Sequence, residues 1–161
     1  MSARQKGFSL IELLIVVAII LVIAAIAIPN LLRSRMAANE ASAVASLRTV
    51  NTSEVVYQST YGGSYAPSLT DLSDGGTATN CAPSATPTAT SACLIDSVLA
   101  SGTKSGYTFT YVPVATGGLD TSYTLTGDPV GATGQRHFFT DQTNVIRVNS
   151  GVPASASDPA I

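Results

Sequence analysis

Near its amino terminus the chain reads Lys6-Gly7-Phe8-Ser9-Leu10-Ile11-Glu12-Leu13-Leu14-Ile15-Val16-Val17, and an apolar run continues from there to Ile28. As an α-helix, the run from Phe8 to Ile28 would be about 31 Å long, close to the thickness of about 30 Å of a bilayer's hydrocarbon core. The run is therefore long enough to cross a membrane. Glu12 is its one charged residue. A carboxylate in the hydrocarbon layer is unfavourable unless it is paired, so the sequence predicts a positively charged partner for Glu12.

Three interpretations of the apolar run differ in what becomes of it. A secretory signal peptide would be removed at small residues, and Ala25-Ile26-Ala27 could imitate such a site. A plain signal anchor would hold a domain outside the membrane but would leave Glu12 without a role. The third interpretation accounts for every residue, and it rests on a family resemblance.

Residues Lys6 to Val17 resemble the amino terminus of type IV pilins and of the pseudopilins of type II secretion. The shared pattern combines basic residues, a glycine, an aromatic residue directly after it, and a glutamate fifth from the cut. The resemblance covers residues 1 to about 60 strongly and the remainder only in general organisation. It implies that a prepilin peptidase cuts between Gly7 and Phe8 and methylates the new amine of Phe8. Residues 1–7 would be the leader, and residues 8–28 the helix of the membrane and filament core.

Cleavage at Gly7 would also provide the partner that Glu12 requires. The new amine of Phe8 would lie about one helical turn from Glu12, within reach in the same chain or from a neighbour. The resemblance implies the neighbouring subunit's amine. Such a pair would fix the register of an incoming subunit, because a subunit out of register would bury unpaired charges.

Residues 29–61 are predicted to form an amphipathic helix that continues into a globular head. Pro29 lacks an amide donor, so we expect a kink or a loosened turn there, and the resemblance implies partial unwinding in a filament. Gly62-Gly63 would end the helix. Glu54 falls on the predicted core face and weakens its apolar pattern, whose members are Met36, Ala43, Leu47, Val50, Tyr57 and Tyr61. Four charged side chains are expected to face solvent or other subunits: Arg33, Arg35, Glu40 and Arg48.

Residues 62–161 are predicted to form the head, which begins with an irregular connection over residues 62–104. Short helical turns are expected near Asp71-Leu72 and from Leu94 to Ala100. A disulfide between Cys81 and Cys93 would close the 81–93 loop and add roughly 3 kcal/mol of stability. Free thiols or a metal site are the alternatives. The enclosed segment is expected to be a bare surface loop, with O-glycosylation as the alternative.

The hydrophobic period changes to two from residue 105, which is typical of β-strands. The runs are Tyr107 to Tyr111, Tyr123 to Leu125, His137 to Thr140 and Val145 to Val148. About four antiparallel strands over residues 105–148 are therefore expected, with their apolar face on the helix. The prediction is an α+β fold, a long amino-terminal helix whose second half packs on a small antiparallel sheet, and the resemblance implies this same pilin fold. Residues 152–159 are expected to be loose.

The sequence favours no catalytic role. Its single histidine, His137, is expected to be structural or partly exposed, and neither a nucleophile elbow nor a phosphate loop is present. No enzyme activity or cofactor is predicted. Asp120, Asp128 and Asp141 are weak candidates for calcium, which the major pseudopilins bind, but their spacing matches no calcium loop. The chain has 8 Lys and Arg against 10 Asp and Glu, so no basic patch predicts nucleic acid as a partner.

The predicted function is that of a structural subunit in a type IV pilus-like filament. Its predicted partners are other copies of the chain, prepilin peptidase, a membrane assembly platform and the bacterial inner membrane before assembly. After assembly the filament would lie outside the cell. A type II secretion pseudopilin, in a periplasmic pseudopilus, is the alternative, and a membrane-anchored binding domain is a further one. The Thr-rich loop bounded by the cysteines favours the pilin, because such a surface suits exposure outside the cell.

Overall fold

The structure is a computed structural model that describes residues 7–76, 81 and 86–161. It divides into two compact units, one that ends at Arg35 and one from Met36 to Ile161. The predicted leader falls outside the described residues apart from Gly7, as do residues 82–85 of the loop between the cysteines, where O-glycosylation was the alternative.

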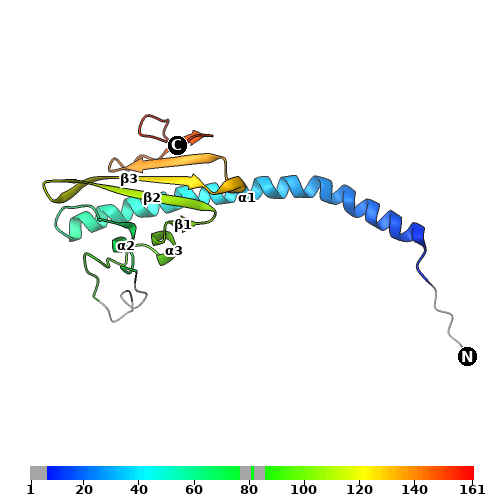
Figure 1. The fold of residues 1–161 in the computed structure, drawn as a ribbon, viewed down its shortest axis with the longest axis horizontal. Helices are drawn as coiled ribbons and strands as arrows, with labels where there is room; N and C mark the ends of the chain where they lie inside the picture. The colour runs from blue at the N-terminus through cyan, green and yellow to red at the C-terminus, as the bar shows by residue number, and fades with distance from the viewer. Residues whose placement is uncertain (1–6, 77–80, 82–85) are drawn as a thin grey trace, which may run out of the picture. The chain divides into compact units, whose positions relative to one another are not determined.

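Helix α1 spans Leu10–Thr60. The first unit contains the beginning of this helix, which is drawn in blue in Figure 1. Proline deprives a helix of one amide donor, yet α1 is continuous through Pro29. The predicted kink therefore does not interrupt the helix of this single chain, and unwinding in a filament stays a prediction.

The second unit combines the rest of α1 with an antiparallel sheet in the order β1-β2-β3-β4-β5. In Figure 1 the strands run beside the cyan part of α1. The element bounds are α2 Leu69–Leu72, α3 Ser97–Ala100, β1 Thr103–Lys104, β2 Tyr107–Thr116, β3 Leu119–Pro129, the 3-10 helix η1 Gly131–Thr133, β4 Arg136–Asp141 and β5 Arg147–Ser150. The predicted α+β pilin-like fold is confirmed.

The sheet has one strand more than the four expected. The additional strand, β1, has only two residues, and it pairs with the first two residues of β2. Gly102 and Gly106 flank it with positive φ angles of 79° and 74°, which allow the tight turns that bring β1 against β2. So short a strand has no detectable period in the sequence.

The core lies between one face of the sheet and the predicted stripe of α1. The buried members of that stripe are Ala43, Leu47, Val50 and Tyr57. They belong to one cluster with the alternating residues Tyr107, Phe109, Tyr123, Leu125 and Phe138 of the strands. Asn51 crosses this interface, because its Nδ2 donates to Thr140 Oγ1 (2.9 Å) and its Oδ1 accepts from the Tyr123 hydroxyl (3.0 Å).

Glu40 corrects the expectation of a solvated or subunit-facing charge. Its side chain is 11% exposed, and Oε2 accepts a charged hydrogen bond from Arg136 Nε at 2.7 Å. The backbone amide of Gln135 donates to Oε1 at 3.0 Å. The segment that leads into β4 thus supplies the donors that make burial of this carboxylate favourable.

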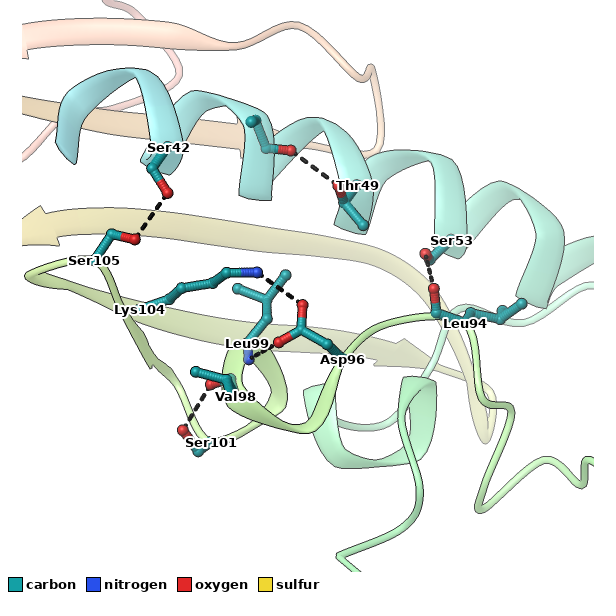
Figure 2. Close-up of polar contacts among 11 residues, drawn as sticks. Ser42, Thr49, Ser53, Leu94, Asp96, Val98, Leu99, Ser101, Lys104 and Ser105 are labelled. Atoms are coloured by element: carbon teal, nitrogen blue, oxygen red, sulfur yellow. Dashed lines mark hydrogen bonds and ion pairs between the residues drawn. The ribbon is translucent and has the colours of Figure 1, made fainter. Parts of the chain in front are cut away.

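Two hydrogen bonds that Figure 2 shows attach α1 to the segments before and after β1. Ser53 donates to the Leu94 carbonyl (3.3 Å), and Ser42 donates to the Ser105 hydroxyl (2.9 Å). Between these points Asp96 caps α3 through the Leu99 amide (2.9 Å). Both short helices that the sequence predicts are present.

The head has two further structural features, a disulfide and an ordered carboxyl-terminal segment. Cys81 and Cys93 form the predicted disulfide. The expectation that residues 152–159 are loose is wrong, since Ala154 is buried and Asp158 accepts from Asn149 Nδ2 at 2.8 Å. The last residues pair with β5: Ala160 forms a bridge with Arg147, and Val148 N donates to Pro159 O at 3.0 Å. This pairing covers a strand edge that would otherwise be open.

Candidate processing and assembly segment

The predicted cleavage site lies directly before the first turn of α1. Phe8 is 79% exposed, and neither Gly7 nor Phe8 is part of the helix. The Ser9 carbonyl accepts from the Leu13 amide at 3.3 Å, which places Ser9 at the helix cap. The peptide bond between Gly7 and Phe8 is therefore in an exposed stretch outside the helix.

Glu12 is the third residue of α1, and its side chain caps the amino terminus of the helix. Its Oε2 accepts a hydrogen bond from the Ser9 backbone amide at 2.9 Å. Ser9-x-x-Glu12 is the sequence of a capping box, in which a glutamate reaches back to the amide of the cap residue. The carboxylate also lies where the partial positive charge of the helix amino terminus favours it. A local sequence pattern thus places this side chain toward the cleavage site.

The same geometry brings Glu12 within reach of the amine that cleavage would create. The nitrogen of Phe8 belongs to the residue next to Ser9, and neighbouring α-carbons are about 3.8 Å apart. A carboxylate that already accepts from the Ser9 amide needs only a side-chain rotation to approach it. In the uncleaved chain that nitrogen is part of a neutral peptide bond, so it offers no positive charge.

The first part of α1 presents an apolar surface that this chain leaves uncovered. The large hydrophobic side chains from Phe8 to Leu32 that are exposed have exposed fractions between 46% and 79%. By length and composition α1 could cross a membrane, and the apolar stretch in question has no buried residues within the chain. Such a surface requires lipid or other protein around it.

The three calcium candidates lie apart. Asp120 and Asp128 lie near opposite ends of β3, about 26 Å apart at the rise of an extended strand. The Asp128 carboxylate is 2.6 Å from His137 Nδ1, and that of Asp141 accepts from the Thr143 amide at 2.9 Å. Among the described residues no group of three His, Cys, Asp or Glu side chains is placed to hold a metal.

Sequence reasoning missed the buried polar residues of α1. Glu54 is fully buried, and Asn51 is 5% exposed. The signal was present for Glu54, because it follows Val50 by four residues and precedes Tyr57 by three. A charged residue at a core position of a helical stripe is either an error in the pattern or a buried group with its own partners.

Comparisons with known proteins find a family motif in the amino-terminal segment and sequence similarity to type IV pilus subunits. Residues 2–28 match the family described as the prokaryotic N-terminal methylation motif. The chain is 49% identical over 55 residues to the type IV wide pilus major component PilA4 of Thermus thermophilus, covering 34% of this chain and 42% of that protein. It is 43% identical over 53 residues to the type IV major pilin protein PilA of Myxococcus xanthus, covering 33% of this chain and 24% of that protein.

The similarity is therefore confined to part of each protein. The matched segment spans less than half the length of either relative, and about a third of this chain. Both relatives are named as subunits of type IV pili. The amino-terminal segment of this chain thus carries the methylation motif, and the chain is similar to type IV pilus subunits, as its sequence predicts.

Proposed function

We propose that this chain is a structural subunit of a type IV pilus-like filament and is processed by a prepilin peptidase between Gly7 and Phe8. The observation that carries the proposal is an exposed apolar helix with one carboxylate, Glu12, positioned at the helix start beside the cleavage site. The methylation motif over residues 2–28 supports this assignment. The long apolar surface supports residence in the inner membrane before assembly.

Assembly would follow from the electrostatics of that segment. Cleavage converts the Phe8 nitrogen from a neutral amide into a cationic amine, which methylation leaves cationic. In a filament core built from such helices, the amine of one subunit and the Glu12 carboxylate of another would neutralise each other. A subunit docked out of register would bury two unpaired charges, each at a cost of several kcal/mol. The pair would therefore select one register, while the apolar surface supplies the attraction.

The remaining parts of the proposal concern partners and location. An assembly platform in the membrane would extract each processed subunit, and the disulfide-closed head would lie on the filament surface outside the cell. A disulfide suits an exported compartment. No active site is required of this chain, since the peptidase would perform the chemistry.

Substitutions of Glu12 test the proposal, because Glu12→Gln separates charge from capping. Glutamine can replace glutamate in a capping box, so the helix start should be kept while the negative charge is lost. We expect both Glu12→Gln and Glu12→Ala to be cleaved and inserted into the membrane, with at least tenfold fewer filaments in sheared cell fractions. Ile11→Leu, which changes no charge, is the matched control and should assemble normally.

Two results would count against the proposal in different ways. Abundant normal filaments from Glu12→Ala would remove the assembly role of the carboxylate. Wild-type assemblies found only in the periplasm would instead indicate a type II secretion pseudopilin.

A further inference from the structure

Glu54 is a fully buried carboxyl group in the head, far along α1 from the assembly segment. Its exposed fraction is 0%. Oε2 accepts one hydrogen bond, from the Ala66 backbone amide at 3.0 Å, while Oε1 has no hydrogen-bond partner of good geometry among the described residues. The contact joins α1 to the connection that follows it, since Ala66 is itself fully buried.

Among the described residues, no basic group forms an ion pair with Glu54. In the described part of the chain, the basic groups in ion pairs are Lys104, Arg136 and His137, and each pairs with another carboxylate. The titratable groups that face Glu54 are neutral or acidic: Tyr57 on α1, Tyr111 on β2, and Asp120 and Tyr123 on β3. Ionising this carboxyl would therefore place an unpaired negative charge inside the core.

Ala66 is held from both sides by this cluster. Its amide donates to Glu54, and its carbonyl accepts from the Tyr111 hydroxyl at 2.7 Å. The neighbouring Tyr65 amide donates to the Asp120 carbonyl at 2.9 Å. The connection over residues 62–67 is thus attached to α1 through Glu54 and to the sheet through Tyr111 and Asp120.

We propose that Glu54 is a protonation switch: the head packs around its neutral carboxyl, and ionisation, which leaves a buried charge without a cationic partner, destabilises the head and with it the attachment of the 62–67 connection to α1. The switch is independent of filament assembly. It requires only the buried carboxyl, its hydrogen bond from the Ala66 amide and the absence of an ion-pair partner among the described residues.

The direction of the effect follows from the change in proton affinity on folding. Burial raises the pKa of Glu54 from 4.5 to about 7, and the Asp120 charge adds to the rise, whereas the Ala66 amide and Tyr111 hydroxyl oppose it. A group with a raised pKa contributes stability that is complete below its unfolded pKa and is lost as pH rises through its folded pKa. The head should therefore lose stability between pH 4.5 and about 7.

Hydrogen exchange of the full-length chain in neutral detergent micelles tests the switch. The readout is the protection of peptides that contain Ala66, corrected for the intrinsic exchange rate at each pH. In the wild type, protection should fall by up to about tenfold per pH unit between pH 5 and 7. In Glu54→Gln, which retains an acceptor for the Ala66 amide, it should change by less than about twofold per unit.

Glu40→Gln is the matched control on the same helix. The pKa of Glu40 is lowered below its usual value, so this group is already ionised in the pH window of Glu54. Glu40→Gln should keep the wild-type slope. Equal slopes in wild type and Glu54→Gln, or a wild type without a slope, would overturn the proposal. If Glu54→Gln does not fold, the carbon-13 shift of the Glu54 carboxyl in the wild type decides: a midpoint near 7 supports the switch, and one near 4.5 overturns it.

Discussion

Glu40 and Glu54 are carboxylates of the same helix whose surroundings favour opposite charge states. Glu40 receives hydrogen bonds from Gln135 and from the Arg136 guanidinium. Burial opposes its ionisation, but these donors and the Arg136 charge outweigh burial, so the pKa of Glu40 falls below its usual value. Glu54 receives one neutral donor, and burial decides its pKa. The difference comes from segments far away in sequence.

The Glu40 contact should stabilise the head through an ionised carboxylate. We expect Glu40→Ala to lower the free energy of unfolding by about 2 kcal/mol at neutral pH, because the hydrogen bonds that an ionised carboxylate accepts from the Gln135 amide and the Arg136 guanidinium are lost. A group with a lowered pKa contributes stability that is present above its unfolded pKa and is lost as pH falls through its folded pKa. The difference between wild type and Glu40→Ala should therefore shrink below about pH 4.5.

Urea unfolding of the full chain in detergent, followed by tyrosine fluorescence, measures this difference. Arg48→Gln is the control, since Arg48 is an exposed residue of the same helix and forms no ion pair within the described residues. A loss for Glu40→Ala no larger than for Arg48→Gln would contradict a stabilising role.

At the scale of elements, the connection between α1 and β1 has little regular structure and depends on cross-links. Within this connection, backbone hydrogen bonds join the segment around Cys93 to α2. Leu94 N donates to Leu72 O at 2.7 Å, and Ala92 N donates to Asp71 O at 2.8 Å. The disulfide between Cys81 and Cys93 closes the loop beside these contacts. Such a connection is costly to order and gains from a covalent constraint.

Replacing both cysteines by serine should therefore destabilise the head. For a loop of this length the chain-entropy argument gives a loss of about 3 kcal/mol. When a reductant is added, the free energy of unfolding of the wild type, measured by urea unfolding, should fall by a similar amount. A reductant should not change the stability of the double variant. A wild type that is equally stable with and without reductant would contradict this account.

The elements that could be predicted from sequence are those with a long, regular period. Tyr107, Phe109 and Tyr111 alternate along β2, and the apolar spacing of Ala43, Leu47 and Val50 indicates the core face of α1. β1 has no such period, since two glycine turns position it. The carboxyl-terminal segment was also missed, because its pairing with β5 depends on a strand edge and not on its own composition.

At the scale of the whole molecule, the chain joins two parts whose sequences carry different kinds of information. The Gly7 to Glu12 segment could be interpreted from sequence because its chemistry is local: a capping box and an apolar run lie within a few turns of helix. The head could be predicted as a fold but not as a site. Asn51 acquires its partners only when distant strands pack on α1, and Glu54 acquires its hydrogen bond only when the connection after the helix folds back onto it.

The family motif covers residues 2–28 of the chain. About a third of this chain matches two type IV pilus subunits. The proposed function therefore rests on the segment that carries Glu12, and its decisive event is the cut that creates an amine beside that carboxylate.

Mass spectrometry of filaments sheared from cells that express this chain tests that event directly. The account predicts that the chain is a component of the filaments and begins at an N-methylated Phe8, with Gly7 and the preceding residues absent. A chain that begins at Ile28, as cleavage after Ala27 by a signal peptidase would produce, or a filament fraction that lacks this chain, would contradict it.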